Sequence, residues 1–276
     1  MIANVLTIAG TDPSGGAGIQ ADIKTFSALG AYACSAITAV VAQNTQGVRD
    51  FVALEPGFVA RQIDAVFEDV RIDAVKIGMI ANAGIAKAVA DRLRAHRARN
   101  VVLDPVMVAK SGHALLDPAA VTAVRELLVP LATLITPNLP EAAVLLGRED
   151  MWTAETMRAA LPELLALGSR WVLLKGGHLP GSADSTDLLA GPEGTTAFAA
   201  PRIATTNDHG TGCTLSSAVT ALLPGRGMVE SVGAAKAYLQ GALAAAGALD
   251  VGHGHGPVHH FHGLWPSTNE RVDFVP

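Results

Sequence analysis

The sequence predicts an α/β fold in which a mostly parallel sheet is covered by helices. Short apolar runs alternate along the chain with segments of helical periodicity. The runs are apolar at consecutive positions, which is typical of strands buried on both faces. The predicted strands are residues 5–8, 74–77, 101–103, 133–135 and 171–174. Because such sheets bind ligands beyond the carboxyl ends of their strands, we expect the functional residues directly after these runs.

The segments between the strands have the apolar spacing of helices. The predicted helices are residues 57–70, 82–96, 118–131, 153–167, 211–223 and 229–246. Between residues 188 and 203, two short β-rich stretches predict a hairpin that leads from the last strand to a glycine-rich loop. We expect residues 1–265 to form a single domain and residues 266–276 to be a loose C-terminal extension.

Composition narrows the functional classes. The 276 residues carry a formal net charge of -5, so the basic surface that nucleic acids require is not expected. Two cysteines, Cys34 and Cys213, are too few for a disulfide framework and indicate a cytoplasmic location. We expect no export signal at the N-terminus. The apolar stretch 228–247 contains charged residues, which favours a buried or dimer-facing helix over a membrane span.

Residues 207–217 are the most informative stretch, since they place a Gly-Thr-Gly-Cys run at the start of a predicted helix. The first N–H groups of a helix lack internal acceptors and attract anions. Donors from Gly210 to Cys213 would stabilise charge on a phosphoryl group in transfer. The helix dipole is also expected to lower the pKa of the Cys213 thiol. Cys213 could then be a general base, a covalent nucleophile partnered by His209, or simply a packed side chain.

Acidic side chains follow two of the predicted strands. Asp104 ends the strand at 101–103, while Asn138 and Glu141 follow the strand at 133–135. The two carboxylates could hold Mg²⁺, directly or through water, beside nucleotide phosphates. Asn138 and Glu141 also have the spacing of a helix capping box, and the two roles can coexist.

Lys175 follows the strand at 171–174 and precedes two glycines that allow close approach of a ligand. Its ammonium group suits a phosphate. The spacing of a Walker A motif does not occur in the sequence, which argues against a P-loop enzyme. The glycine-rich loop at 10–22 lacks the third glycine of the dinucleotide fingerprint, which argues against a dehydrogenase.

Two further polar features have simple interpretations. Gln43 ends an apolar run, where its amide could pair with a heterocycle, although an isolated glutamine more often stabilises its own loop. Five histidines crowd residues 252–263 and suggest a metal site. No zinc-type motif accompanies them, and the interleaved glycines and proline indicate a folded loop. We therefore expect these imidazoles to pack or cap locally.

Taken together, five motifs resemble the hydroxymethylpyrimidine/phosphomethylpyrimidine kinase family. They are residues 9–22, 104–112, 136–141, 175–178 and 209–214, and the closing stretch 254–261 is similar as well. The resemblance covers nearly the whole chain. It implies a ribokinase-like three-layer α/β/α sandwich with a small β-hairpin flap, and a homodimer. It also implies two phosphorylations for thiamine biosynthesis, both using ATP and Mg²⁺. The first converts 4-amino-5-hydroxymethyl-2-methylpyrimidine to its monophosphate, and the second converts this monophosphate to the diphosphate.

The resemblance also implies roles for individual residues. The catalytic set is Lys175, Gly210, Gly212 and Cys213, with Cys213 where related sugar kinases keep a catalytic aspartate. The substrate-binding set is Gly10, Asp22, Gln43, Met79 and Val106. The ATP-binding set is Asn138, Lys175, Gly176, Asp187, Thr211, Gly212 and Lys236. The metal set is Asp104 and Glu141. Asp208 departs from the threonine expected there, and its carboxylate should weaken phosphate binding slightly or help to order a metal.

Other functions stay open on the sequence alone. Pyridoxal or pyridoxine kinase is the same reaction on another hydroxymethyl heterocycle. A non-catalytic nucleotide or pyrimidine sensor is disfavoured by the joint presence of Asp104, Glu141 and Lys175, and a Cys-dependent hydrolase would ignore ATP. If Cys213 is a base, Cys213→Ala should slow the first phosphorylation more than the second, because a monophosphate is already largely ionised at neutral pH.

Overall fold

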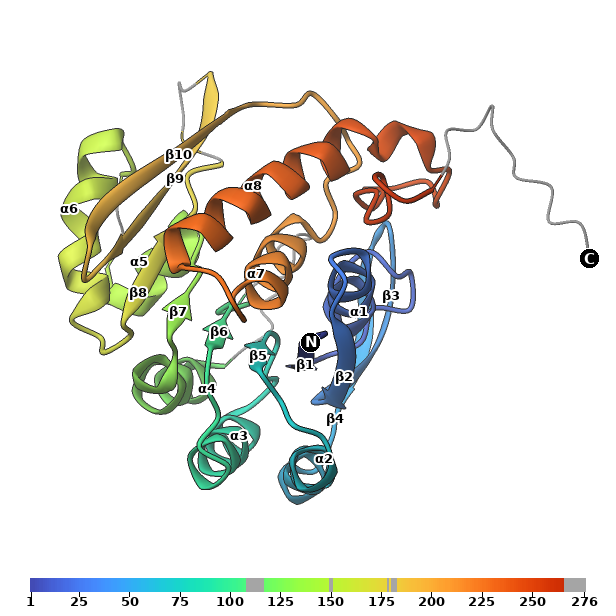
Figure 1. Cartoon of the computed structure of the whole chain (residues 1–276), viewed down its shortest axis with the longest axis vertical. Helices are drawn as coiled ribbons and strands as arrows, with labels where there is room; N and C mark the ends of the chain where they lie inside the picture. The colour runs from blue at the N-terminus through green and yellow to red at the C-terminus, as the bar shows by residue number, and fades with distance from the viewer. Residues whose placement is uncertain (108–116, 149–150, 178, 180–182, 266–276) are drawn as a thin grey trace, which may run out of the picture.

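The central element of the fold is a twisted sheet of eight strands in the order β10-β9-β8-β7-β6-β5-β1-β2 (Figure 1). The computed structural model describes residues 1–107, 117–148, 151–177, 179 and 183–265. From β2 through β1, β5, β6 and β7 to β8, neighbouring strands are parallel. Strands β9 and β10 are antiparallel additions at the β8 edge. The mostly parallel sheet that the sequence predicts is therefore confirmed.

The bounds of the elements are as follows. The strands are β1 (Asn4–Ala9), β2 (Tyr32–Ile37), β3 (Ala39–Asn44), β4 (Gly47–Ala53), β5 (Ala74–Ile77), β6 (Val101–Leu103), β7 (Leu134–Ile135), β8 (Trp171–Leu174), β9 (Asp184–Gly191) and β10 (Gly194–Pro201). The α-helices are α1 (Gly18–Ala28), α2 (Pro56–Asp69), α3 (Ala83–Ala95), α4 (Pro118–Ala123), α5 (Leu139–Leu146), α6 (Ala154–Leu165), α7 (Thr211–Leu222) and α8 (Met228–Ala244).

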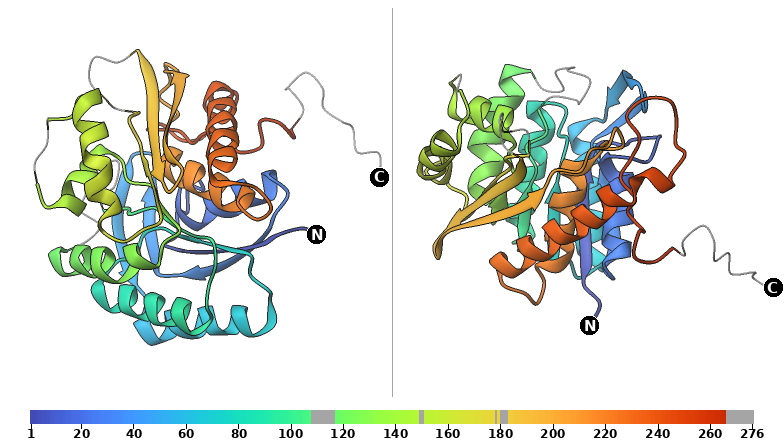
Figure 2. Two further views of the ribbon diagram at one scale, coloured as in Figure 1. Left: turned by 60° about the vertical axis from the view of Figure 1, so that its left-hand side comes forward. Right: turned by 90° about the horizontal axis from the view of Figure 1, so that it is seen from above.

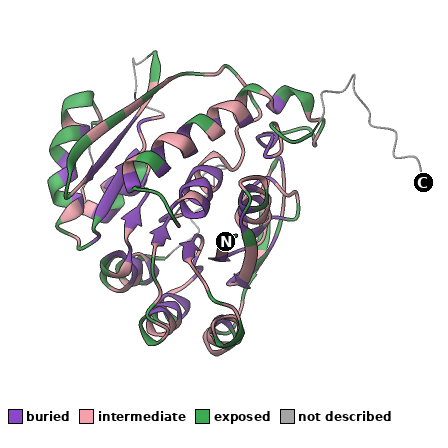
Figure 3. Cartoon of the chain, in the orientation of Figure 1, coloured by how far each residue is buried: buried purple, intermediate pink, exposed green. Residues whose placement is uncertain are grey.

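Helices cover both faces of the sheet and make three layers (Figure 2). Side chains alternate across the strands, so Leu6 and Val75 join the core beneath α2 and α3. Their neighbours Val5 and Ala74 pack on the other face, against Phe26 of α1. Helices α7 and α8 cover the same face as α1, over β6 to β9. The inner strands β1, β5, β6, β7 and β8 are buried between these helices (Figure 3), as the consecutive apolar positions predicted, whereas the edge strands β2 and β10 are mostly exposed or half-buried.

Two hairpins extend the core. The hairpin expected at residues 188–203 is formed by β9 and β10, begins at Asp184 and pairs with the main sheet through β8. The separate two-stranded sheet is β3–β4, which the sequence analysis did not assign. It stands beside the end of β1, because the backbone N–H of Thr11 donates to Ala39 O at 3.0 Å.

One predicted helix is broken in the structure. The segment 118–131 is α4 followed by a π-helical turn (Val124–Leu128) and a 3₁₀ turn (Val129–Leu131). Pro130 has no N–H group to donate to the preceding turn, so a regular helix cannot continue through it. The other predicted helices agree with the structure to within a few residues, while α1 and α5 were not among them; for α5 the sequence predicted only the capping box at its start.

The predicted C-terminal extension, residues 266–276, lies outside the described residues. The same holds for His178 and for residues 108–112 of the second motif. In the part of the chain that the structure describes, no helix combines the length and the apolarity needed to cross a bilayer.

Candidate active site

Lys175 is the centre of a charged cluster at the carboxyl ends of the strands. It follows β8, and its Nζ lies 2.9 Å from Asp104 Oδ1, after β6, and 3.9 Å from Glu141 Oε2, on α5. Burial alone would lower the pKa of Lys175, but the two carboxylates outweigh it and raise this pKa to about 12. The side chains that the sequence placed after separate strands therefore meet at one edge of the sheet.

The two carboxylates of this cluster differ in charge state. Burial opposes ionisation of Asp104, but the charges of Lys175 and Lys76 hold its pKa below the usual range. For Glu141, burial dominates over Lys175 and raises the pKa to about 7. Glu141 also completes a capping box, in which the side chain of Asn138 accepts from its N–H and its Oε2 accepts from the Asn138 N–H. Glu141 therefore caps the start of α5 and lies beside Lys175 at the same time.

The first turn of α7 packs directly on this cluster. A Cβ atom at Gly212 would lie 3.3 Å from Lys175 Nζ and 3.6 Å from Asp104 Oδ2. One turn further, Ser216 Oγ donates to Asp104 Oδ2 at 3.3 Å. The absence of a side chain at Gly212 leaves the lysine and the helix N–H groups open to the same anion, as a phosphoryl-transfer site requires.

Gly210 fixes the start of α7 against the first loop. Its φ of +79° is in the left-handed region, and a Cβ there would lie 1.8 Å from the carbonyl oxygen of Gly16. No side chain fits this contact. The glycine is therefore required by the close approach of two backbone segments that are far apart in sequence.

Cys213 lies in the first turn of α7, where the backbone N–H of Gly18 donates to its thiol. Burial raises the pKa of this thiol to about 11, although the charge of Lys76 acts in the opposite direction. The sequence-based expectation of a lowered pKa is wrong, because loss of solvation outweighs the favourable charges around the helix start. The thiol is protonated at neutral pH.

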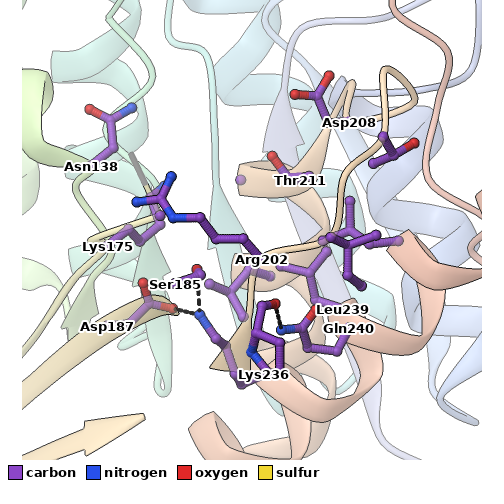
Figure 4. Close-up of a pocket in the computed structure, with 17 residues that line it drawn as sticks. Asn138, Lys175, Ser185, Asp187, Arg202, Asp208, Thr211, Lys236, Leu239 and Gln240 are labelled. Atoms are coloured by element: carbon purple, nitrogen blue, oxygen red, sulfur yellow. Dashed lines mark hydrogen bonds and ion pairs between the residues drawn. The ribbon is translucent and has the colours of Figure 1, made fainter. Parts of the chain in front are cut away.

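A cavity of about 320 Å³ opens beside the cluster, between β9–β10 and helices α7 and α8 (Figure 4). Its wall includes six of the seven residues expected to bind ATP: Asn138, Lys175, Asp187, Thr211, Gly212 and Lys236. The seventh, Gly176, lies behind the wall, where its N–H donates to Asp187 Oδ1 at 2.9 Å. The other carboxylate oxygen of Asp187 is 2.6 Å from Lys236 Nζ.

Other parts of the cavity wall were not found from the sequence. They are Gly177, Ser185, Pro201, Arg202, Ile203, Thr205, Leu215, Leu239, Gln240 and Leu243. Most of them lie on β10, on the loop after it, and on α8. Gly177 belongs to the motif 175–178 and Leu215 to the stretch 207–217, although neither was assigned a role. No motif marks the others, because the hairpin and α8 bring them to the cavity through the tertiary fold. Asp208 also lines the cavity, and its Oδ1 lies 3.2 Å from His255 Nδ1.

On the other side of the charged cluster, a hydrogen-bond network is centred on Asp12. The buried Asp12 carboxylate accepts from Ser14 Oγ at 2.7 Å, and its Oδ2 lies 2.8 Å from His209 Nε2. The amide of Gln43 also acts on this carboxylate and lowers its pKa. Burial opposes its ionisation, but these hydrogen bonds hold the pKa of Asp12 well below its usual range. His209 is thus engaged by a carboxylate that links the first loop to the start of α7.

Gly10 and Met79 lie beside β3, the strand that carries Gln43. A Cβ at Gly10 would be 3.0 Å from Met79 Sδ and 3.6 Å from Ala39 O. Val106, two residues after Asp104, is half-buried and lines a small hollow with Ile80. The structure therefore gathers Gly10 and Met79 beside the β3–β4 hairpin, which we call the flap.

Asp22 is the exception among the expected substrate-binding residues. It is fully buried, and both carboxylate oxygens accept from Lys76 Nζ at 2.9 Å. Thr7 and Ser217 donate to the same carboxylate, at 2.6 and 2.7 Å. Burial opposes the charge of Lys76, but the carboxylate of Asp22 holds the pKa of Lys76 above its usual range. Because Asp22 is fully buried and engaged by these groups, it does not face a substrate. It instead holds α1 and α7 to the sheet.

The histidines of the C-terminal loop make local contacts only in part: His262 and His259 do so, whereas His260 and His255 contact residues at the start of α7 and just before it. His260 Nε2 lies 3.2 Å from Thr214 Oγ1, and burial lowers the pKa of His260 to about 3, so that it stays neutral. His262 Nδ1 lies 3.1 Å from His259 O. The loop is also joined to the α7 start, because the His209 N–H donates to Gly256 O.

Asp104 and Glu141 fit a magnesium ion. Among the described residues no group of three or more acidic, histidine or cysteine side chains could hold a metal. Magnesium does not need such a group, since it usually keeps several waters and takes one or two carboxylates together with substrate phosphates. Asp104 and Glu141, beside Lys175 and the start of α7, have the donor chemistry that such a site needs.

The three-layer fold and the phosphate-binding edge of its sheet define a kinase of the ribokinase-like class. Comparison with known proteins agrees. A model of the family described as phosphomethylpyrimidine kinase matches residues 12–259. The chain belongs to this family, which confirms the family and the enzyme class expected from its motifs.

The relatives include two bacterial proteins named hydroxymethylpyrimidine/phosphomethylpyrimidine kinase. The one from Salmonella typhimurium is 60% identical over 95% of this chain and 98% of the relative. The one from Escherichia coli is 58% identical, with the same coverage. Because these relatives are named as kinases, the comparison does not support the alternatives of a non-catalytic sensor or a Cys-dependent hydrolase.

Solved structures share the fold. A phosphomethylpyrimidine kinase from Clostridium difficile is 42% identical and has a TM-score of 0.78, over 87% of this chain and 99% of that chain. A pyridoxal kinase from Staphylococcus aureus, solved with AMP-PCP and pyridoxal, is 32% identical and has a TM-score of 0.87, over 96% and 95%.

Proposed function

We propose that the protein transfers the γ-phosphoryl group of ATP to the hydroxymethyl group of 4-amino-5-hydroxymethyl-2-methylpyrimidine, and then to the resulting monophosphate. The observation that carries this proposal is the end wall of the cavity, where Lys175, Asp104 and the glycine start of α7 meet. This wall brings the ammonium group of Lys175 and the N–H donors of the helix start together where a transferring phosphoryl group needs them. Relatives at 58–60% identity are named for both phosphorylations.

ATP would occupy the 320 Å³ cavity with its phosphates toward Lys175 and its base toward the apolar side chains of α8. Thr211 and Gly212 would donate backbone N–H groups to the phosphates, while Asn138 and the Asp187–Lys236 pair would line the nucleotide. A magnesium ion held by Asp104 and Glu141, directly or through water, would neutralise part of the phosphate charge. These contacts would also hold the γ-phosphoryl group of ATP in line with the hydroxyl or phosphate group that receives it.

The pyrimidine would lie on the flap side of the charged cluster. Gln43 would recognise the ring through its amide, and Gly10, Met79 and Val106 would form the wall beside it. Asp22 would act from beneath this wall by holding α1 and α7 to the sheet. Since Gln43 and His209 share the carboxylate of Asp12, the ring-binding side and the phosphate-binding side are joined by one buried group.

A pyridoxal kinase is the second candidate, because the Staphylococcus aureus pyridoxal kinase has a TM-score of 0.87 with this chain, against 0.78 for the Clostridium difficile enzyme. Sequence identity favours the first candidate, at 42% against 32%. Backbone similarity reports the shared fold, whereas substrate choice depends on a few side chains of the site. The pyrimidine therefore remains the proposed substrate.

The test is a time course with purified protein, ATP, Mg²⁺ and hydroxymethylpyrimidine, in which monophosphate and diphosphate are resolved, with pyridoxine in a parallel reaction. We expect the monophosphate to appear first and to be replaced by the diphosphate. Lys175→Met should abolish both products, whereas Lys87→Met, an exposed lysine paired with Asp91, should leave them unchanged. Product from pyridoxine alone would support the second candidate, and no ATP consumption with either compound would contradict both.

We also propose that the protein works as a cytoplasmic homodimer. Its cysteines, Cys34 and Cys213, are free thiols, which suits a reducing compartment. The outer face of the flap exposes two valines that pair across β3 and β4, Val40 and Val52, with exposures of 51% and 66%. A small sheet with exposed β-branched residues is a suitable surface for a second copy of the chain.

A further inference from the structure

The nucleotide cavity contains a cation that has no assigned role. Three of its lining residues are basic: Lys175, Lys236 and Arg202. Lys175 is paired with Asp104 at 2.9 Å, and Lys236 with Asp187 at 2.6 Å, so the charges of both lysines are already compensated. Arg202 differs from the lysines in this respect.

Among the described residues, the partners of the Arg202 side chain are backbone oxygens. Its Nη2 donates to Leu179 O at 2.6 Å, and its Nε donates to Asp184 O at 3.4 Å. Within the described ranges no carboxylate lies within salt-bridge distance of its guanidinium. The two carbonyls therefore fix the orientation of the side chain, while its charge and its remaining N–H groups stay available.

The direction of the side chain indicates which part of a nucleotide it would meet. Arg202 follows the last residue of β10, and its guanidinium extends across the cavity toward the side lined by Asn138 and Lys175 (Figure 4). This is the side nearest to the glycine start of α7. The apolar part of the wall, Leu239 and Leu243, lies on α8 and suits a base rather than a phosphate.

We propose that Arg202 binds the polyphosphate of the nucleotide and completes its charge neutralisation from the hairpin side of the cavity. The inference rests on the proposed use of ATP and adds a residue to it. A guanidinium is a planar fork that matches two phosphate oxygens, which a lysine ammonium does not. Arg202 is exposed, and no described carboxylate lies within salt-bridge distance, so its charge is not compensated before the nucleotide arrives.

The experiment measures dissociation constants of adenosine, AMP, ADP and ATP by calorimetric titration of the full chain without acceptor. For Arg202→Gln we expect an unchanged constant for adenosine and a constant for ATP that rises roughly tenfold, as for loss of one charge-assisted contact. Arg202→Lys should recover only part of this loss, because it keeps the charge but not the fork. Arg158→Gln is the matched control, since Arg158 is exposed, donates to one backbone carbonyl and does not line the cavity.

The series separates the possible failures. If Arg202 only braces the hairpin, Arg202→Gln weakens adenosine and ATP equally and lowers the melting temperature, and the inference is wrong. Equal constants for the wild-type protein and Arg202→Gln with ATP would also overturn it. If the wild-type protein binds none of the four compounds, the proposed function itself fails, and that result is seen without any variant.

Discussion

At the scale of single residues, Cys213 is the position where charge state decides between two roles. Its pKa of about 11 leaves on the order of one thiolate in ten thousand molecules at pH 7, so the premise for a thiolate base is lost. We expect Cys213→Ala to slow both phosphorylations by similar factors, because it removes packing at the start of α7. Cys213→Ser keeps a side chain of similar size and should retain most of the wild-type activity. The measurement is the rate constant of each step, with the alcohol or the monophosphate supplied separately.

A first step slowed at least tenfold more than the second in Cys213→Ala would contradict this expectation. It would restore the general base that the sequence suggested, since only the alcohol has a proton to lose during attack. In that case the wild-type rate of the first step should also rise with pH between 7 and 9, toward the raised pKa of the thiol, while the second step should not.

The sequence predicted which residue types carry the chemistry, but not all of their partners. Lys175, Asp104 and Glu141 could be placed together because each follows a parallel strand, and such strands end at one edge. The Asp12–His209 contact spans 197 positions, and no periodicity connects its partners. The charge state of Cys213 was mispredicted because burial, which a sequence does not report, exceeded the helix dipole.

At the scale of elements, the start of α7 depends on Gly210. Alanine would place a Cβ 1.8 Å from Gly16 O in a left-handed backbone conformation, so the first loop and α7 must move apart. A displacement of about 1 Å in a phosphate-binding segment can cost about 100-fold in rate, and we expect Gly210→Ala to lose at least this much in kcat for both steps. Steady-state kinetics with each acceptor provide the measurement.

Gly227→Ala is the control for this substitution. Gly227 caps the start of α8 with an ordinary φ of -70°, and a Cβ there meets nothing within 4 Å. Its kcat should stay within about twofold of the wild-type value, as expected for a surface substitution without a steric conflict. If Gly210→Ala behaved like Gly227→Ala, the close contact of the two loops would not matter for catalysis.

Elements with strong apolar runs were the ones that the sequence predicted well. The strands β6 and β8 have consecutive large apolar residues, and β5 has two such residues around a buried lysine; all three were found at their observed bounds. Strand β2 and helix α1 were missed because they are rich in small or polar residues and follow glycine turns; Gly18, at the start of α1, has a φ of +54°. The break of the segment 118–131 depends on one proline whose effect a periodicity does not register.

At the scale of the whole molecule, the sheet divides the site between two surfaces that come from different parts of the chain. The nucleotide side is built by β9–β10, α7 and α8, and the acceptor side by the first loop and the flap. Among the described residues, the start of α7 and the charged cluster lie between the two sides. A change in the position of the flap therefore reaches the chemistry through Gln43 and Asp12, which makes the proposed dimer relevant to activity.

The flap is where we expect a second copy of the chain to bind. Val40→Lys with Val52→Lys would place two charges on paired positions of β3 and β4, and burying them in an interface without partners is unfavourable. We expect the wild-type protein to have twice the mass of the chain in light scattering after gel filtration, and the double variant to have the mass of one chain. Val144→Lys, a valine of 42% exposure on α5, should leave the dimer intact. A monomeric wild-type protein, or a dimeric double variant, would show that this face is not the interface.

In the monomeric double variant, a higher KM for the pyrimidine with an unchanged KM for ATP would show that the dimer supports the flap rather than the nucleotide side.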